Sequence, residues 1–261
     1  MELVLGCTTR PYSNITIAEA CQHIAASGYT DVALFGRALN AQTSHSDVLA
    51  LRRLVHDTGL LPSMLLGATH LKLGLEAATE EYLRLIDNTA LLGATWLLDT
   101  GVSEDALFEG YWSLMQKAAP YADSVGVHLT LKPHGGITLT SQDLIDAHHR
   151  VNHPAFGICY DPGNIIYYSK GEERPETRLA EVAPLVTTGI IKDCVLRGGI
   201  PDVMVTPGEG LVDFQAVLSG LAQGGFRGPL YVECVAGESM AEIDQNVQHT
   251  RAFVQEILAG L

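Results

Sequence analysis

The chain has 261 residues, close to the ~250 typical of a single α/β barrel, and 47% of them are apolar. The formal charge is −14, from 30 acidic and 16 basic residues, and no run of lysine or arginine interrupts it. Such a field repels phosphate backbones and argues against nucleic acid as a partner. No stretch reaches the ~18 apolar residues of a membrane span. Residues 1–4 lack the basic start of a signal peptide, so we expect a cytoplasmic protein without a membrane partner.

The alternation of short apolar runs with longer helical patterns predicts eight strands and eight helices. The expected strands are residues 2–7, 31–35, 61–67, 95–99, 127–131, 156–160, 188–192 and 230–233. The expected helices are residues 15–27, 44–58, 77–92, 103–124, 141–151, 175–185, 213–223 and 240–258. Residues 197–210, rich in Gly and Pro, are expected to form a long loop after the seventh strand.

This order predicts a parallel sheet, because each helix must return the chain to the same edge. We therefore expect one domain over residues 1–261, a (β/α)8 TIM barrel. An open, doubly wound sheet is the alternative, but no G-x-G-x-x-G motif follows the first strand.

The five cysteines predict neither a zinc site nor a disulfide framework. They are Cys7, Cys21, Cys159, Cys194 and Cys234, and none forms a C-x-x-C pair. Four of them lie near the ends of apolar runs, which is typical of small buried residues.

Ionisable residues follow each of the last four expected strands, at the point where the apolar run stops. In chain order these strand ends carry Lys132 and His134, then Asp161 and Asn164, then Lys192, then Glu233. The carboxyl ends of barrel strands share one mouth, where the active sites of such barrels lie. Charged side chains there are costly to desolvate unless they are paired or used, so we expect a functional site.

Five segments at these ends resemble the motifs of the xylose isomerase-like superfamily of sugar isomerases and epimerases. They read KPH at 132–134, YDPGN at 160–164, IIKD at 190–193, PGEGLVD at 207–213 and VE at 232–233. The resemblance implies a TIM barrel in which a divalent cation is held by four residues. These are a Glu after the fifth strand, an Asp after the sixth, a His in the seventh and a Glu after the eighth.

Only two of those four positions match in this chain. Asp161 and Glu233 match, whereas Lys132 replaces the first acid and Ile190 replaces the His. Two carboxylates about 4 Å apart repel by roughly 4 kcal/mol at an effective dielectric near 20, and an ammonium between them would cancel this repulsion as a metal does. We therefore favour a site without a metal cofactor. The alternative is Mn²⁺ or Mg²⁺ on Asp161 and Glu233, with His134 as a substitute ligand.

The resemblance also implies roles for the polar residues. Glu233 would be a base in proton transfer through an enediolate, and Lys132 would stabilise the oxyanion in place of a metal or form a Schiff base. Asp161 would orient Lys132 or hold a substrate hydroxyl. His134 is a candidate proton shuttle, with a purely supporting hydrogen-bonded imidazole as the alternative.

Four further residues are candidates for binding substrate. Asn164 could hold a sugar hydroxyl, and His70 could line the mouth of the barrel. Lys192 and Arg197 could bind a carboxylate or phosphate, and ion pairs to Asp193 and Glu209 are the competing interpretation.

Three functions remain open at this point. The first is a sugar or keto-sugar isomerase or epimerase that needs no divalent metal. The second is a carbon–oxygen lyase or hydratase acting on an oxidised sugar or glycoside, and the third is a non-catalytic sugar-binding relative. In each case the expected partner is a small-molecule sugar, and the chain could form a homo-oligomer.

Overall fold

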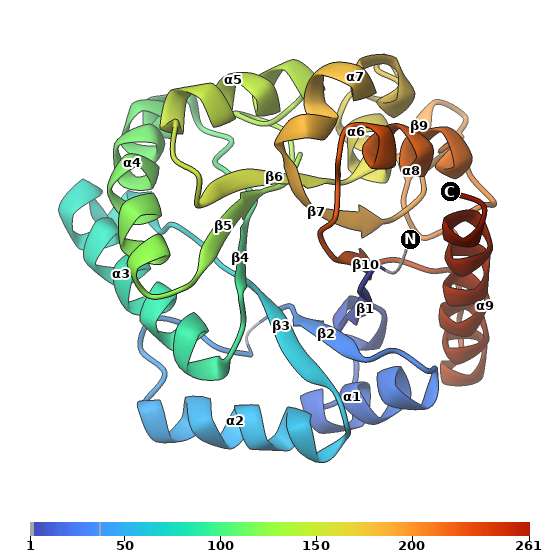
Figure 1. Ribbon diagram of the computed structural model, residues 1–261, viewed down its shortest axis with the longest axis horizontal. Coiled ribbons are helices and arrows are strands. Elements are labelled where there is room, and N and C mark those ends of the chain that lie inside the picture. The colour runs from blue at the N-terminus through green and yellow to red at the C-terminus, as the bar shows by residue number, and fades with distance from the viewer. Residues whose placement is uncertain (1–2, 37) are drawn as a thin grey trace.

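Eight parallel strands close into a barrel in the order β1-β10-β7-β6-β5-β4-β3-β2 (Figure 1). This computed structural model describes residues 3–36 and 38–261. The strands are β1 (Leu5–Thr8), β2 (Asp31–Leu34), β3 (Leu61–Leu66), β4 (Trp96–Asp99), β5 (His128–Leu131), β6 (Phe156–Tyr160), β7 (Val186–Ile191) and β10 (Leu230–Val232). The predicted (β/α)8 barrel is thereby confirmed, and the open sheet is excluded because β1 pairs with both β2 and β10.

Helices surround the barrel and pack their apolar faces on it (Figure 1). They are α1 (Ile17–Ala26), α2 (His45–Asp57), α3 (Leu75–Leu92), α4 (Phe108–Ser124), α5 (Ser141–Val151), α6 (Pro162–Tyr168), α7 (Leu179–Val182), α8 (Phe214–Gln223) and α9 (Met240–Ala259). Capping boxes at Thr16, Thr140 and Ser239 start α1, α5 and α9, because each side chain satisfies an otherwise unpaired backbone N–H. Within the described ranges, no helix is both long and apolar enough to cross a bilayer.

Several predicted boundaries were wrong. The helix expected from residue 103 begins as α4 at Phe108, after a 3₁₀ turn at Asp105–Leu107, and Leu107 rather than Ser103 precedes it. The helix expected over 175–185 is two 3₁₀ turns flanking the four residues of α7. The start of the first expected strand, Glu2, lies outside the described residues.

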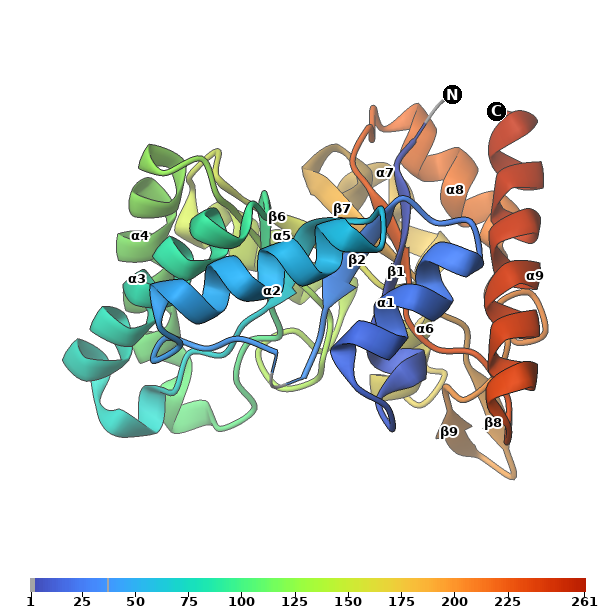
Figure 2. The same ribbon diagram turned by 90° about the horizontal axis from the view of Figure 1, so that it is seen from below.

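Two strands and one short helix were not predicted. Residues Val195–Arg197 (β8) and Ile200–Asp202 (β9) form an antiparallel hairpin at the start of the expected long loop. In Figure 2 this hairpin projects from the end of the barrel opposite to the C-terminus of α9. The short helix α6 was also missed, and it follows directly on the Asp161 motif.

The side chains that fill the interior of the barrel show which way the ionisable residues at the strand ends point. Ala33, Met64, Leu98, Cys159, Ile190 and Tyr231 form a small buried cluster separate from the core between sheet and helices. Successive side chains of a strand point to opposite faces. Residues two positions after an interior residue therefore point inward again, one layer nearer the carboxyl end. Asp161 therefore points inward two positions after Cys159, Lys192 two positions after Ile190, and Glu233 two positions after Tyr231.

We predict that Gly163→Ala separates α6 from β7. A Cβ at Gly163 would lie 2.7 Å from the carbonyl oxygen of Lys192 and 2.8 Å from its Cγ. Overpacking of this kind typically costs about 1–3 kcal/mol of unfolding free energy, which urea denaturation would measure.

Gly110→Ala is the matched control, since Gly110 lies in α4 and a Cβ there would meet only Leu71 at an ordinary 3.5 Å. This change should leave the unfolding free energy unchanged or raise it by up to about 1 kcal/mol, the helix preference of Ala over Gly. Equal stability of Gly163→Ala and the control would contradict close packing of α6 on β7.

Candidate active site

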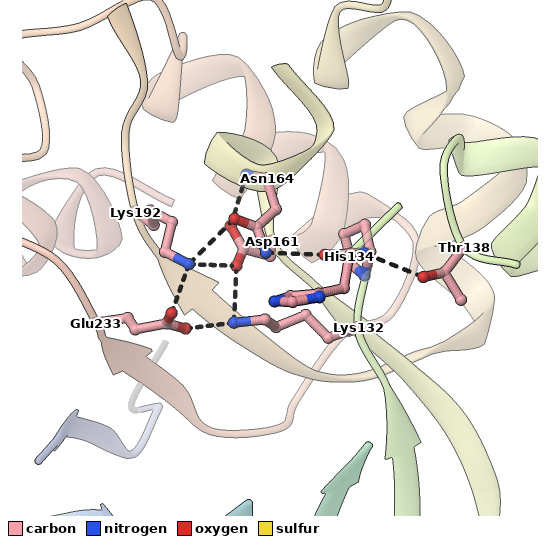
Figure 3. A network of polar contacts seen from close by, with 8 residues as sticks. Lys132, His134, Thr138, Asp161, Asn164, Lys192 and Glu233 are labelled. Carbon is pink, nitrogen blue, oxygen red and sulfur yellow. Dashed lines mark hydrogen bonds and ion pairs between the residues drawn. The ribbon is translucent and has the colours of Figure 1, made fainter. Parts of the chain in front are cut away.

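Two lysines and two carboxylates meet inside the carboxyl mouth of the barrel, where their side chains point toward one another (Figure 3). The Lys132 ammonium lies 2.5 Å from Glu233 Oε2 and 3.3 Å from Asp161 Oδ2. The Lys192 ammonium lies 3.2 Å from the same Asp161 oxygen and donates to Glu233 Oε1. We call these four residues the lysine–carboxylate tetrad. Each ammonium bridges both carboxylates, so the tetrad is a closed ring with no net formal charge.

The backbone around Asp161 and Asn164 fixes one side of this ring. Asp161 caps α6, because its Oδ1 accepts the backbone N–H of Asn164 at 2.9 Å and leaves Oδ2 for the two lysines. The Asn164 amide donates to the Pro133 carbonyl at 2.8 Å, and its oxygen accepts from Lys192 at 3.1 Å. A single short helix thus links the ends of β5, β6 and β7.

The tetrad is almost completely buried. Lys132, Asp161, Lys192 and Glu233 are between 0% and 5% exposed. Burying each of these ions costs several kcal/mol, which only close pairing can offset. Burial alone would raise the pKa of Glu233, but the ammonium groups of Lys132 and Lys192 outweigh it and lower that pKa to about 2. Burial by itself lowers the pKa of Lys192, and here Asp161 and Glu233 prevail and raise it above its usual range.

His134 lies beside the tetrad (Figure 3), and the residue as a whole is exposed. Its backbone N–H donates to Thr138 Oγ1 at 3.0 Å, and its ring lies 4.9 Å from the ring of Tyr168. Partial enclosure of the ring lowers the pKa of His134, and the ammonium groups of Lys132 and Lys192 lower it further. The carboxylates of the tetrad oppose this effect less strongly. The two lysines of the tetrad therefore affect the pKa of His134 more strongly than its two carboxylates do.

A cavity of about 840 Å³ opens beside His134. Its walls are residues 68–73 after β3 and residues 99–104 from the last residue of β4 onward, with Glu81, Leu107, His134 and Tyr168. The backbone N–H of Lys132 donates to the carbonyl of Asp99 at 2.9 Å, so the floor of the cavity adjoins the tetrad. None of the four tetrad side chains lines the cavity itself.

A family model described as xylose isomerase-like TIM barrel matches residues 21–257. The chain belongs to the xylose isomerase-like TIM barrel family. Among curated protein sequences, none is significantly similar to it.

Solved structures share the fold of this family member at low identity. A xylose isomerase-like TIM barrel protein from Mycobacterium smegmatis, in complex with magnesium, is 17% identical with a TM-score of 0.80, and 98% of each chain is covered. A D-psicose 3-epimerase from Clostridium cellulolyticum H10, with D-tagatose, is 13% identical with a TM-score of 0.80, covering 98% of this chain and 99% of that one. A D-allulose 3-epimerase from Methylomonas sp. is 16% identical with a TM-score of 0.77, and 98% of each chain is covered.

The donor set of this xylose isomerase-like barrel does not fit a divalent cation. Over residues 3–36 and 38–261, no three side chains of His, Cys, Asp or Glu gather as a metal site would need. The two carboxylates of the tetrad already accept from two ammonium groups, and an ion between them would meet both positive charges. Ile190, at the expected His position, is buried in the interior cluster and carries no donor atom.

The remaining predicted binding residues are dispersed. His70 lines the cavity, where its Nδ1 lies 2.9 Å from Glu81. Arg197 lies on the β8–β9 hairpin, is mostly exposed and pairs with Asp202 rather than with Glu209. The proposed pairing of Lys192 with Asp193 was wrong, since Lys192 belongs to the tetrad.

Asp193 instead organises the segment after the hairpin. Its two carboxylate oxygens accept four backbone N–H groups, from Cys194, Gly208, Gly210 and Val212, at 2.8–3.0 Å. The PGEGLVD motif thus serves as a loop wound around one buried carboxylate.

Sequence reasoning missed Asp99 as part of the site. Asp99 ends β4 and lines the cavity, and its Oδ1 accepts from the Gly101 N–H at 2.7 Å and from the Tyr111 hydroxyl at 2.9 Å. Burial raises the pKa of Asp99 to about 6, although these two donors act against it. The signal was available, because Asp99 follows an apolar run as Asp161 does.

We predict that the free energy of unfolding falls as the pH drops from about 5 toward 2. The pKa of Glu233 is about 2 in the folded chain, against an ordinary value of 4.5. The stabilisation is therefore complete above the ordinary value and is lost as the pH falls through the folded-state value. Chemical denaturation at a series of pH values measures this dependence.

Glu233→Gln should flatten that acid dependence and cost about 3–5 kcal/mol at pH 7, since it leaves an ammonium without a full counter-charge. The control is Glu238→Gln, which replaces an exposed glutamate and should change little. A Glu233→Gln protein as stable as the control would contradict the tetrad as a stabilising unit.

Proposed function

We propose that this protein is a sugar or keto-sugar isomerase or epimerase that moves a proton beside a carbonyl, through an enediolate, without a divalent metal. The observation that carries the proposal is the pair of ammonium groups between Asp161 and Glu233. The resemblance assigns this place to a cation, and the tetrad fills it with two fixed positive charges.

Stabilising the enediolate is the part of the reaction that this arrangement suits best. Removal of a proton beside the carbonyl leaves a negative charge on oxygen, which nearby positive groups stabilise in a site of low polarity. The potential at His134 is dominated by Lys132 and Lys192. An oxyanion that forms on that side of the tetrad would be stabilised by both lysines.

The proton acceptor in this proposal is His134, with Glu233 as a counter-ion. A carboxylate with a pKa of about 2 is a weak base. The lowered pKa of His134 keeps its imidazole neutral at pH 7, and its ring reaches the cavity. His134 would take the proton from carbon and return it to the neighbouring carbon in an isomerisation. An epimerisation would need a second proton donor on the opposite face of the enediolate, because inversion requires the proton to return to the same carbon from the other side.

The structural relatives agree with this reaction type. Two of them are named as 3-epimerases, of D-psicose and of D-allulose. Epimerisation beside a carbonyl requires the same proton abstraction and the same stabilised oxyanion.

We expect the purified protein to exchange carbon-bound hydrogen of a ketose or keto-glycoside with deuterium from D₂O, measured by NMR or mass spectrometry. Lys132→Met should slow this exchange by roughly 10²–10³, the usual loss when one oxyanion stabiliser is removed. His134→Gln should slow it by roughly 10²–10⁴, the usual contribution of a general base.

Lys117→Met is the matched control, because Lys117 is exposed on α4. Circular dichroism would show whether each variant keeps its fold. Release of water or of an aglycone would indicate the lyase or hydratase instead. Binding of sugars without exchange, elimination or hydration would indicate the non-catalytic relative.

We also expect exchange to persist after dialysis against a chelator and to gain nothing from added Mg²⁺ or Mn²⁺. The tetrad leaves no set of oxygen and nitrogen ligands for these ions. A loss of exchange in chelator that is restored by Mn²⁺ would contradict this expectation.

A further inference from the structure

The cavity beside His134 is larger than a free sugar requires. Its volume of about 840 Å³ lies toward the upper end of the roughly 300–1,000 Å³ range of sites that hold drug-sized ligands. A hexose is much smaller than such ligands. A sugar ring placed against His134 would leave most of the cavity unfilled.

Several apolar and aromatic side chains line this cavity. Leu71 and Leu73 come from the segment after β3, Val102 and Leu107 from the segment after β4, and Tyr168 from the end of α6. Leu73 is 59% exposed. Apolar side chains that gather in a concave site are typical of a surface that a ligand covers.

The charges in the cavity disfavour an anionic ligand. Three carboxyl residues line it, namely Glu81, Asp99 and Glu104, against one lysine, Lys72. The Lys72 ammonium lies 2.5 Å from Glu104 and is already paired. A phosphate in this cavity would meet acidic neighbours and a cation that is already engaged.

From these three observations we infer the substrate class of the site: an uncharged keto sugar with an apolar aryl or alkyl substituent, whose substituent occupies the cavity between the segments after β3 and β4. The inference rests on the proposed function, because it places the sugar carbonyl at His134 beside the tetrad. The substituent then extends along Leu71, Leu73, Val102 and Leu107, away from the charged ring.

The test compares deuterium exchange for three probes: a phenyl keto-glucoside, the corresponding methyl keto-glucoside, and a hexulose 6-phosphate. We expect the phenyl compound to exchange with a kcat/KM at least about 10-fold above that of the methyl compound, as apolar contacts of this size typically give. The phosphate should exchange more slowly than either.

The double variant Leu73→Gln/Leu107→Gln should abolish the preference for phenyl over methyl by lowering kcat/KM for the phenyl compound about 10-fold more than for the methyl compound, since it removes apolar contacts that only the phenyl group can make. The matched control is Leu49→Gln/Leu61→Gln. Leu49 lies on α2 and Leu61 starts β3 at the amino end of the barrel, and both are exposed outside the cavity. The control should keep the preference.

The possible failures are distinguishable. Exchange with no preference for phenyl, a preference for the phosphate, or equal loss for both glucosides in the double variant would overturn the inference and leave the proposed function standing. Absence of exchange for every probe and for the unsubstituted ketoses would overturn the proposed function, and the inference with it.

Discussion

The mutual neutralisation of four buried charges is the constraint on which the rest of this site depends. Lys132, Asp161, Lys192 and Glu233 come from four neighbouring strand ends and are nearly inaccessible to water. Any one of them alone would cost several kcal/mol to bury. In the tetrad each ammonium bridges both carboxylates, and this pairing removes most of that cost. The burial of each of the four residues therefore depends on the other three.

The surrounding structure is organised to hold that ring in place. Asp161 is held by its cap of α6, and Asn164 links Lys192 to the end of β5. The close approach of α6 to β7 requires Gly163, because a Cβ there would clash with Lys192. Asp193, the residue after Lys192, gathers the following loop with its two carboxylate oxygens. The proposed function would require rigid support of this kind, because catalytic groups must be held within a narrow geometry.

A pair of lysines differs physically from the metal that the family motifs imply. A divalent ion can be lost and replaced, whereas two ammonium groups are attached to the chain and bring their own hydrogen-bond donors. The same carboxylates that would hold a metal now hold the lysines, which lowers the pKa of Glu233 and weakens it as a base. Under the proposed function the base would then come from elsewhere, and His134, which follows β5 and lines the cavity, is the candidate.

The sequence by itself determined the fold class and most of the site. The alternation of strands and helices, and the ionisable residues at the ends of the last four strands, predicted the barrel and the meeting of Lys132, Asp161 and Glu233. This succeeded because strand periodicity and the shared mouth of a barrel are local rules applied to each strand in turn. The tertiary structure alone decided that Lys192 joins the tetrad and that Arg197 and His70 do not. It also decided that the segments after β3 and β4 enclose a large cavity with apolar side chains in its lining. These outcomes depend on distances between residues far apart in the chain, and on the balance between the cost of burial and the gain from pairing, neither of which the pattern of a single strand contains.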